Sequence, residues 1–455
     1  MTTILSFVIV IGLLILIHEL GHFFVARWTG VGVERFSIGF GPVLLRWKGK
    51  ETEYCLSVIP MGGYVKMMGE EDNPLEGGGG ASYDAAKAFA KKPLWARFLI
   101  VFAGPGMNLV LAVVIWALVL GTLGRPVWPA VLGRVAPDGP AATAGLVTND
   151  TVVAINGRSI SHWEDLERAI ASAGAQPLQL RVRHDGTERT LTVTPRRRSV
   201  VDPIFHESHE TWDIGAGPQV IPQISSVSAD SPAKRAGLQP GDVVVAVAGQ
   251  AVYTPDELVE AIRSRPGQAF PLTVEREGRQ LTLTVTPDAV REKGPDGQER
   301  ELGRIQAGIG TKAVRFEPYN PVQAAGYGAA KTWDMIVLTV KGLWKLASRQ
   351  IDSSNIGGPI QIATEAGRQA RDGIASLALF TAIISVNLGV LNLLPVPMLD
   401  GGHLLFFLIE AVLGRPLAAR KREMAQQVGF VLLMLLMGYA LYNDLVRIDA
   451  FKFFR

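Results

Sequence analysis

The sequence reads HELGH from His18 to His22, and this pentapeptide lies inside an apolar run. Residues 4–17 carry no charge, and residues 23–26 continue the run after the second histidine. At 3.6 residues per helical turn, the two histidines project from one face of a helix, one turn apart. That spacing lets two imidazoles bind one Zn²⁺, with Glu19 close enough to take a proton from a water activated by the metal.

Ionisable side chains at membrane depth are costly and usually functional, so this position strengthens the motif. Two other interpretations are a buried His/Glu hydrogen-bond cluster and the apolar core of a signal peptide. The first residues, Met1 to Thr3, lack the basic region of a signal peptide, and no small-residue cleavage site precedes the histidines. We therefore expect a retained transmembrane helix.

The composition indicates a membrane protein of several units. The chain has 455 residues, 48% of them hydrophobic, and a mean hydropathy of +0.22. Its net charge of +3 gives no reason to expect a nucleic-acid partner. Cys55 is the single cysteine, which excludes an internal disulfide and a cysteine-based zinc site.

Four stretches are long and apolar enough to span a bilayer, which takes about 20 residues. They are Ile4–Val25, Leu94–Leu120, Ile374–Leu394 and Val428–Val446. Basic residues crowd the segment between the first two and the segment between the last two, so the positive-inside rule places both in the cytoplasm. The long segment between the second and third spans then lies on the other side, as do both termini.

The first cytoplasmic segment contains two short β-type runs, Val33–Ile38 and Tyr54–Ile59, with glycines between them. They predict a small sheet near the membrane and the metal site. The second span opens with small residues, Ala103 to Gly106, that permit close helix packing. Asn108 follows them and needs a polar partner in lipid, which leaves open whether it packs or acts in the site.

An internal repeat fills the translocated segment. Residues 139–146 (GPAATAGL) match residues 231–238 (SPAKRAGL), and LTVTP recurs at 191 and 283, so both matches are offset by 92 residues (231 − 139 and 283 − 191). Each repeat predicts strands and one helix, Trp163–Ala171 in the first and Pro255–Ser264 in the second, with turns at Asn156-Gly157, Asp185-Gly186 and Glu277-Gly278. The pattern resembles a PDZ domain of the bacterial type, which binds an extended peptide as an added strand. Spacer domains that bind nothing are the alternative.

A second motif follows the third span, from Asn392 to His403 (NLLPVPMLDGGH). Its two prolines end the helix, and its two glycines allow a tight turn. A catalytic zinc takes three protein ligands, and Asp400 is the best third candidate. His403 is the rival, but it lies beyond the glycines in the next helical run. Both motifs lie toward the cytoplasmic ends of parallel spans, so they can share one depth.

These motifs together resemble the site-2 protease family of intramembrane zinc metalloproteases, in its bacterial two-PDZ type. HELGH, FSIGFG at Phe36–Gly41, the twin repeats and NLLPVPMLDGGH carry the likeness over nearly the whole chain. The resemblance implies that His18, His22 and Asp400 bind zinc, that Glu19 is the general base, and that Asn392 helps to hold the substrate or the oxyanion. It implies that the family's membrane-associated β region grips the substrate here with Val58, Ile59, Pro60, Met61, Gly62, Gly63, Tyr64, Val65 and Lys66.

The resemblance also implies the partners: single-pass transmembrane proteins, namely anti-sigma factors after a first cut and remnant signal peptides, in regulated intramembrane proteolysis and stress response. The expected location is the bacterial inner membrane, in contact with lipid, with the PDZ-like domains periplasmic and the metal site toward the cytoplasm.

The expected fold is a multi-pass α-helical membrane protein with four transmembrane helices, a membrane-associated β region and two tandem PDZ-like α+β domains. The expected segments are 1–125 (spans one and two with the β loop), 126–200 and 215–290 (the PDZ-like domains), 315–370 (an amphipathic juxtamembrane helical segment) and 371–455 (spans three and four). Asn320–Arg349 carries the amphipathic helix, because apolar residues alternate there with lysines.

Two rival functions belong to other classes. A non-catalytic membrane PDZ scaffold would have no use for Glu19. A transporter would share the broken helix and the buried acid, but two histidines converging with Asp400 fit transport poorly.

Overall fold

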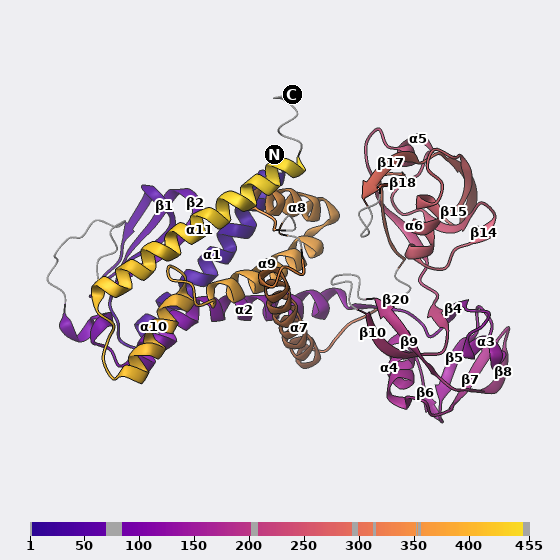
Figure 1. The fold of residues 1–455 in the computed structure, drawn as a ribbon, viewed down its shortest axis with the longest axis horizontal. Coiled ribbons are helices and arrows are strands. Elements are labelled where there is room, and N and C mark those ends of the chain that lie inside the picture. Colours follow the sequence, from indigo (N-terminus) through magenta and orange to yellow (C-terminus); the bar gives the residue numbers. More distant parts are fainter. Residues whose placement is uncertain are drawn as a thin grey trace. The chain divides into compact units, whose positions relative to one another are not determined.

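The computed structural model describes residues 2–69, 84–201, 208–293, 299–312, 315–351, 353 and 356–448. The chain divides into two compact units. The helical unit combines Met1–Gly124 with Pro318–Arg455, and the repeat unit is Arg125–Glu317. Figure 1 shows that the first unit is mainly helical and the second mainly strands.

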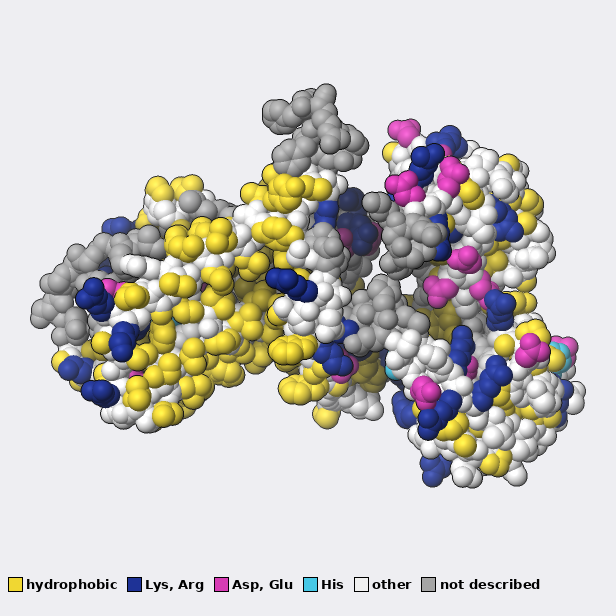
Figure 2. Space-filling view, viewed as in Figure 1, with side chains coloured by type: hydrophobic (Ala, Val, Ile, Leu, Met, Phe, Trp, Pro, Cys, Tyr) yellow, Lys and Arg dark blue, Asp and Glu magenta, His cyan; other side chains and the backbone are white. Residues whose placement is uncertain are grey.

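Four helices of the helical unit are long and apolar enough to cross a membrane, by length and composition. They are α1 (Thr2–Trp28), α2 (Leu94–Leu123), α9 (Ile374–Asn392) and α11 (Ala419–Arg447). Within the described residues these are the four expected spans, although α11 begins well before Val428 because Ala419–Gln427 continues the helix with polar residues. Hydrophobic side chains cover most of the visible face of these helices in Figure 2, as expected of helices in lipid.

Small residues let the helices approach closely. A Cβ added to Gly21 of α1 would lie 2.3 Å from the Ala103 carbonyl oxygen of α2, and one added to Gly389 of α9 would lie 3.1 Å from the Pro105 carbonyl oxygen. Close backbone approach of this kind is how transmembrane helices associate without a hydrophobic driving force. Helix α2 therefore packs against both α1 and α9.

Three further α-helices lie in the described part of the helical unit: α7 (Pro321–Ala347), α8 (Pro359–Asp372) and α10 (Asp400–Leu413). The expected helix from Asn320 is confirmed as α7, which starts with a capping box between Asn320 and Gln323 and with Pro321 in its first turn. It packs against α2 and α9.

The expected sheet is confirmed by β1 (Val33–Lys48) and β2 (Glu53–Met67). Both strands bend, so the first half of β1 pairs on two sides: Arg35, for example, pairs with Glu53 and with Lys66. Residues 63–67 thereby form one edge of the sheet. Phe36 and Val65 of the sheet pack with Phe23 of α1 and Ile100 of α2 in one core cluster, which fixes the sheet against the two helices.

The two largest sheets among the described residues of the repeat unit have four and six strands. The first has the order β6-β5-β7-β8 and the second the order β16-β15-β13-β12-β19, with β14 paired to β13. Their strands are β5 (Thr151–Ile155), β6 (Arg158–Ser159), β7 (Leu178–His184), β8 (Thr187–Val193), β12 (Pro222–Val227), β13 (Val243–Val247), β14 (Gln250–Ala251), β15 (Phe270–Arg276), β16 (Arg279–Val285) and β19 (Ala307–Thr311). The expected helices are confirmed as α4 (Trp163–Ala173) and α6 (Pro255–Arg263), each preceded by a one-turn helix, α3 (Pro140–Thr143) and α5 (Pro232–Arg235).

Each repeat closes on itself. In the first, β11 (Ala216–Pro218) returns to pair with β4 (Leu132–Val135); in the second, β19 returns to β12. A hairpin precedes each closing strand: β9 (Arg196–Val201) with β10 (Ser208–Asp213), and β17 (Asp288–Lys293) with β18 (Glu299–Arg304). Separate hydrophobic cores, one centred on Leu166 and Leu180 and one on Leu258 and Leu272, show that each repeat buries its own apolar residues.

The three expected tight turns are confirmed by their backbone. Asn156-Gly157, Asp185-Gly186 and Glu277-Gly278 each place two consecutive residues at positive φ, between 44° and 84°. That is the geometry of a two-residue hairpin turn matched to strand twist, and it explains the glycine in second position.

A buried aspartate fixes the loop after the short first helix of each repeat. Asp150 accepts hydrogen bonds from the Val147 N–H and from Arg189, both at 2.9 Å. Its equivalent Asp242 accepts one from the Gln239 N–H at 2.9 Å and two from Arg276 at 2.6 and 2.7 Å. Burial alone would raise the pKa of Asp242, but these donors outweigh it and hold the pKa below its usual value.

The segments by which the chain enters and leaves the repeat unit lie side by side. Strand β3 (Arg125–Val127), directly after α2, pairs antiparallel with β20 (Arg315–Glu317), directly before α7, and Val127 faces Arg315 in the register.

Candidate metal centre

Helix α1 presents His18 and His22 one turn apart, as their spacing requires. Both residues are buried, with 9% and 8% of their surface exposed, and their rings meet edge to face with centroids 4.9 Å apart. The two Nε2 atoms lie 3.2 Å apart. Two imidazoles thus point to one place inside the helical unit.

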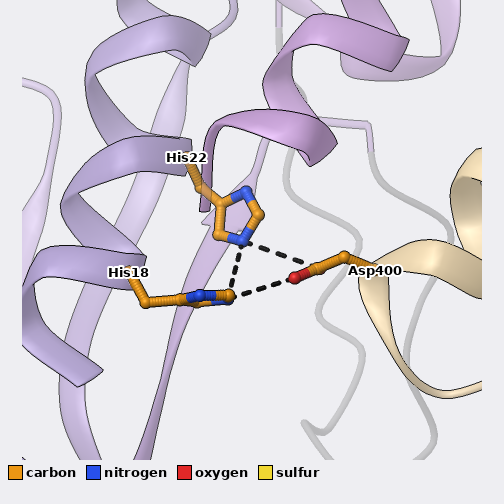
Figure 3. A group of neighbouring side chains, drawn as sticks. All are labelled: His18, His22 and Asp400. Atoms are coloured by element: carbon orange, nitrogen blue, oxygen red, sulfur yellow. Dashed lines mark hydrogen bonds and ion pairs between the residues drawn. The ribbon is translucent and has the colours of Figure 1, made fainter. Parts of the chain in front are cut away.

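Asp400 reaches the same place from α10, of which it is the first residue. Its Oδ2 lies 3.1 Å from His18 Nε2 and its Oδ1 lies 3.6 Å from His22 Nε2. Figure 3 shows the three side chains converging from two different helices. Within the described residues, these three are the one group of histidine, cysteine or acidic side chains with metal-ligand spacing.

The loop before Asp400 packs against Gly401 and Gly402, the two glycines that follow Asp400 in α10. A Cβ on Gly401 would lie 2.1 Å from the Leu394 carbonyl oxygen, and one on Gly402 would lie 2.5 Å from the Val396 carbonyl oxygen. The chain can therefore fold back tightly after α9 only where no side chain intervenes. Met398 takes a positive φ of 91° just before Asp400, a strained conformation of the kind found at functional sites.

The donor set fits Zn²⁺. Ligands about 2.0–2.1 Å from a tetrahedral zinc lie roughly 3.3 Å from one another. The separations here are 3.2 Å between the two Nε2 atoms, 3.1 Å from His18 Nε2 to Asp400 Oδ2 and 3.6 Å from His22 Nε2 to Asp400 Oδ1. His22 Nδ1 lies 2.9 Å from the Ile100 carbonyl oxygen, which can only accept, so this nitrogen carries the proton of the neutral ring. The lone pair of His22 Nε2 consequently points toward Asp400, an arrangement that a cation stabilises.

Helix α2 lies close behind the two histidines. A Cβ on Gly104 would lie 2.2 Å from His22 Nε2 and 2.9 Å from His18 Nε2. Asn108, one turn further along α2, places its amide 3.2 Å from His18 Nδ1. The small residues of this stretch predicted close helix packing, and the sequence left the role of Asn108 open. The close approach of Gly104 to the imidazoles was not predicted.

Glu19 lies beside the edge of the small sheet. Its side chain is buried, and a Cβ on Gly63 of β2 would lie 2.9 Å from Glu19 Cγ. The predicted substrate-binding segment, residues 58–66, lies in β2, and its part from Gly63 onward belongs to the sheet edge. The side chains of Ile59, Pro60 and Met61 lie outside the described part of the molecule.

Asn392 and His403 are the remaining expected residues. Asn392 is the last residue of α9 and is half-buried. His403 lies on α10 with its ring against Phe406, at 6.3 Å between centroids. The rival assignment of His403 as third ligand is thus less favoured than Asp400, whose oxygens approach both imidazoles.

Comparison with known proteins identifies the family. The model of peptidase family M50 matches residues 6–436. The chain belongs to peptidase family M50. The predicted membership of the site-2 protease family is confirmed, and the enzyme is a zinc metalloprotease.

Curated relatives match over nearly their whole length. The regulator of sigma-E protease RseP of Salmonella typhimurium is 37% identical over 454 residues, covering 97% of this chain and 98% of that protein. The protein of the same name from Escherichia coli K12 is 37% identical over 464 residues, with the same coverage. A candidate zinc metalloprotease of Vibrio cholerae is 37% identical over 471 residues, covering 98% of each chain.

Among solved structures, a PDZ domain of an SdrC-like protein from Listeria monocytogenes matches 21% of this chain and 88% of that chain, with 21% identity and a TM-score of 0.15.

Proposed function

We propose that this membrane metalloprotease cuts the transmembrane segments of single-pass membrane proteins, acting on trimmed anti-sigma factors and on remnant signal peptides. The observation that supports this most is the position of the three donors: His18 and His22, on a helix apolar enough to cross a bilayer, converge with Asp400 at zinc-ligand spacing. The relatives whose names give them a role as regulators of sigma-E support the anti-sigma class.

In this proposal His18, His22 and Asp400 hold the zinc, and Glu19 is the general base. When bound, zinc polarises the scissile carbonyl and lowers the pKa of a water toward about 7. Glu19 accepts the proton of the attacking water and delivers it to the leaving amine. Asn392, at the end of α9, helps to hold the substrate or the developing oxyanion.

A transmembrane substrate must unwind before it is cut, because a helix keeps its carbonyls in internal hydrogen bonds. We place the unwound segment along residues 58–66, with the sheet edge that begins at Gly63 as its partner. Strand pairing there would replace the lost hydrogen bonds, and Gly63 adjoins Glu19, so a paired segment would pass the base.

The two repeats are proposed to be PDZ-like domains on the periplasmic side of the inner membrane, with the metal site toward the cytoplasm. The positive-inside rule supports this orientation. The pairing of each repeat's last strand with its first favours bounds of about 128–218 and 222–312, wider than the sequence pattern alone suggests.

The test is cleavage of a model single-pass substrate by the purified protein, with and without a zinc chelator. We predict that Glu19→Gln keeps about one zinc per chain and loses activity by at least ~10²-fold, because the amide matches the carboxylate in size but cannot accept the proton. Elemental analysis measures the metal, and quantified product measures the rate.

The matched control is Glu51→Gln, the same change at an exposed glutamate of the cytoplasmic segment that follows α1, which should leave both quantities unchanged. Near-normal cleavage by Glu19→Gln would contradict the role of Glu19. A folded wild-type protein without stoichiometric zinc would contradict the site itself.

A further inference from the structure

Asn108 is a polar side chain that the proposed reaction leaves without a task. It lies in the apolar helix α2 with 0% of its surface exposed. Its amide nitrogen lies 3.2 Å from His18 Nδ1, while its amide oxygen has no hydrogen-bond partner among the described residues. Buried polar atoms are normally paired, so the orphaned oxygen needs an explanation.

The orientation of an amide is an assignment made from hydrogen-bond logic, because its oxygen and nitrogen are nearly the same size. With the amide nitrogen facing His18, the amide donates to Nδ1, and the neutral ring of His18 would carry its proton on Nε2. That nitrogen faces Asp400 and the Nε2 of His22, which is where a metal ligand needs a lone pair.

Exchanging the two amide atoms resolves the conflict over the His18 tautomer and leaves the NH2 group, in place of the oxygen, without a partner among the described residues. The oxygen then accepts the Nδ1–H of His18, and Nε2 keeps its lone pair for the metal. His22 already shows this arrangement, since its Nδ1–H donates to the Ile100 carbonyl at 2.9 Å. The second partner of a metal-binding histidine ring commonly sets its tautomer and orientation in this way.

Asn108 is also held in place from the opposite side. Its backbone carbonyl accepts a hydrogen bond of 2.7 Å from Ser385 Oγ of α9, and Ser385 is 0% exposed. The hydrogen bond ties α2 to the helix that leads into the Asp400 loop.

We propose that Asn108 is a positioning residue: its amide oxygen accepts the Nδ1–H of His18 and so presents His18 Nε2 to zinc. This inference rests on the proposed role of His18 as a ligand. Loss of an outer partner of a ligating histidine typically weakens metal binding by about 10–100-fold.

The experiment measures the zinc affinity of the metal-free full-length protein by competition with a chelator of known affinity. Asn108→Leu keeps the branched shape of the side chain and removes the acceptor, so its zinc affinity should fall by about 10–100-fold. Asn108→Asp keeps an acceptor at the same distance and should stay within about threefold of wild type. A purely packing role would give the opposite order, because leucine suits an apolar helix better than aspartate.

Ser385→Ala is the matched control, since it removes a hydrogen bond to the same residue without changing the amide. Its zinc affinity should stay near that of wild type. A second readout is the visible absorption of the Co²⁺-loaded protein, which should change in Asn108→Leu and not in Ser385→Ala, while thermal unfolding in detergent verifies that each variant is folded.

Equal zinc affinity in wild type and Asn108→Leu would overturn the inference, as would a loss in Asn108→Asp as large as in Asn108→Leu. The proposed function fails separately, if His18→Ala binds zinc as tightly as wild type does.

Discussion

At the scale of single residues, the site depends as much on missing side chains as on present ones. Gly104 lets the backbone of α2 pass behind both imidazoles, and Gly21 lets α1 approach Ala103. A methyl group on Gly104 would lie 2.2 Å from His22 Nε2, closer than any real Cβ contact. A side chain at position 104 would therefore occupy the space next to the Nε2 atoms of both imidazoles.

We predict that Gly104→Ala loses stoichiometric zinc and, with it, cleavage, because the methyl group collides with the ligating edges of both rings. Elemental analysis of the purified variant measures the effect. Gly106→Ala is the matched control on the same helix, where the new Cβ meets the Phe102 side chain at an ordinary 3.4 Å and zinc should be retained. Full zinc occupancy in Gly104→Ala would show that the helices separate easily and that the contact is unimportant.

The sequence could predict His18, Glu19 and His22 because their spacing is local to one helix. It could predict Asp400 because prolines and glycines mark an interrupted helix around a lone acid. It could not predict Gly104, the Ile100 carbonyl or the partner of Asn108. These three contacts depend on how α1 and α2 are rotated against each other. Hydropathy alone does not determine that rotation.

At the scale of elements, the small sheet has more structure than its two apolar runs indicated. The runs predicted two strands, and the structure contains two long bent strands in which the first half of β1 lies between two halves of β2. A sequence pattern indicates which side chains face each side of a strand, but it does not indicate that one strand pairs with a neighbour on both of its edges. The consequence is an edge, residues 63–67, that begins beside Glu19.

We predict that Gly63→Ala lowers the cleavage rate by on the order of 10–100-fold and leaves zinc binding intact. The added Cβ would lie 2.9 Å from both Glu19 Cγ and the Ser37 carbonyl oxygen, so the base or the edge must shift, and small misplacements of catalytic groups are costly. Rate and zinc content are measured on one preparation. The control is Gly12→Ala in α1, which has no atom within 4 Å of the new Cβ and should change neither the cleavage rate nor the zinc content. Loss of both zinc and activity in Gly63→Ala would contradict the prediction and indicate general disruption of the fold.

At the scale of the whole molecule, the chain leaves the helical unit after α2 and returns to it before α7 through one pair of strands, β3 and β20. The repeat unit is thus an insertion between spans two and three. The sequence repeat predicted its duplication, whereas the hairpin and closing strand of each repeat carry too little sequence similarity to be found by matching. Long-range pairing, such as Ala216 with Val135, is invisible in a local pattern.

Loop charges predict that the repeat unit is translocated while both basic segments stay in the cytoplasm. Single cysteines at the exposed positions 48, 250 and 421, in a Cys55→Ser background, test this in intact spheroplasts. A membrane-impermeant thiol reagent should label position 250 and should label 48 and 421 only after lysis. Labelling of 48 but not 250 in intact spheroplasts would invert the topology.

The last prediction concerns what the repeat unit does. On the proposed topology it lies across the membrane from the metal, so it cannot supply catalytic groups and can act only on what enters. A folded insertion can exclude substrates with large external domains by steric clash and admit trimmed ones. The competing idea is a docking site that recruits a new C-terminus by strand addition.

The register of β3 and β20 offers a clean deletion. Because Val127 pairs with Arg315, residues 129–313 can be replaced by a short Gly/Ser turn that joins the two strands as a hairpin. If the unit excludes by size, this variant should cut untrimmed substrates that the full chain rejects and should still cut trimmed ones. If the unit recruits, trimmed substrates should be cut more slowly and untrimmed ones should stay resistant. Product yields for a matched pair of substrates, with the Glu19→Gln form of the deletion as background, distinguish the two. We expect the first outcome, and loss of trimmed-substrate cleavage in a folded, zinc-loaded deletion would decide for recruitment.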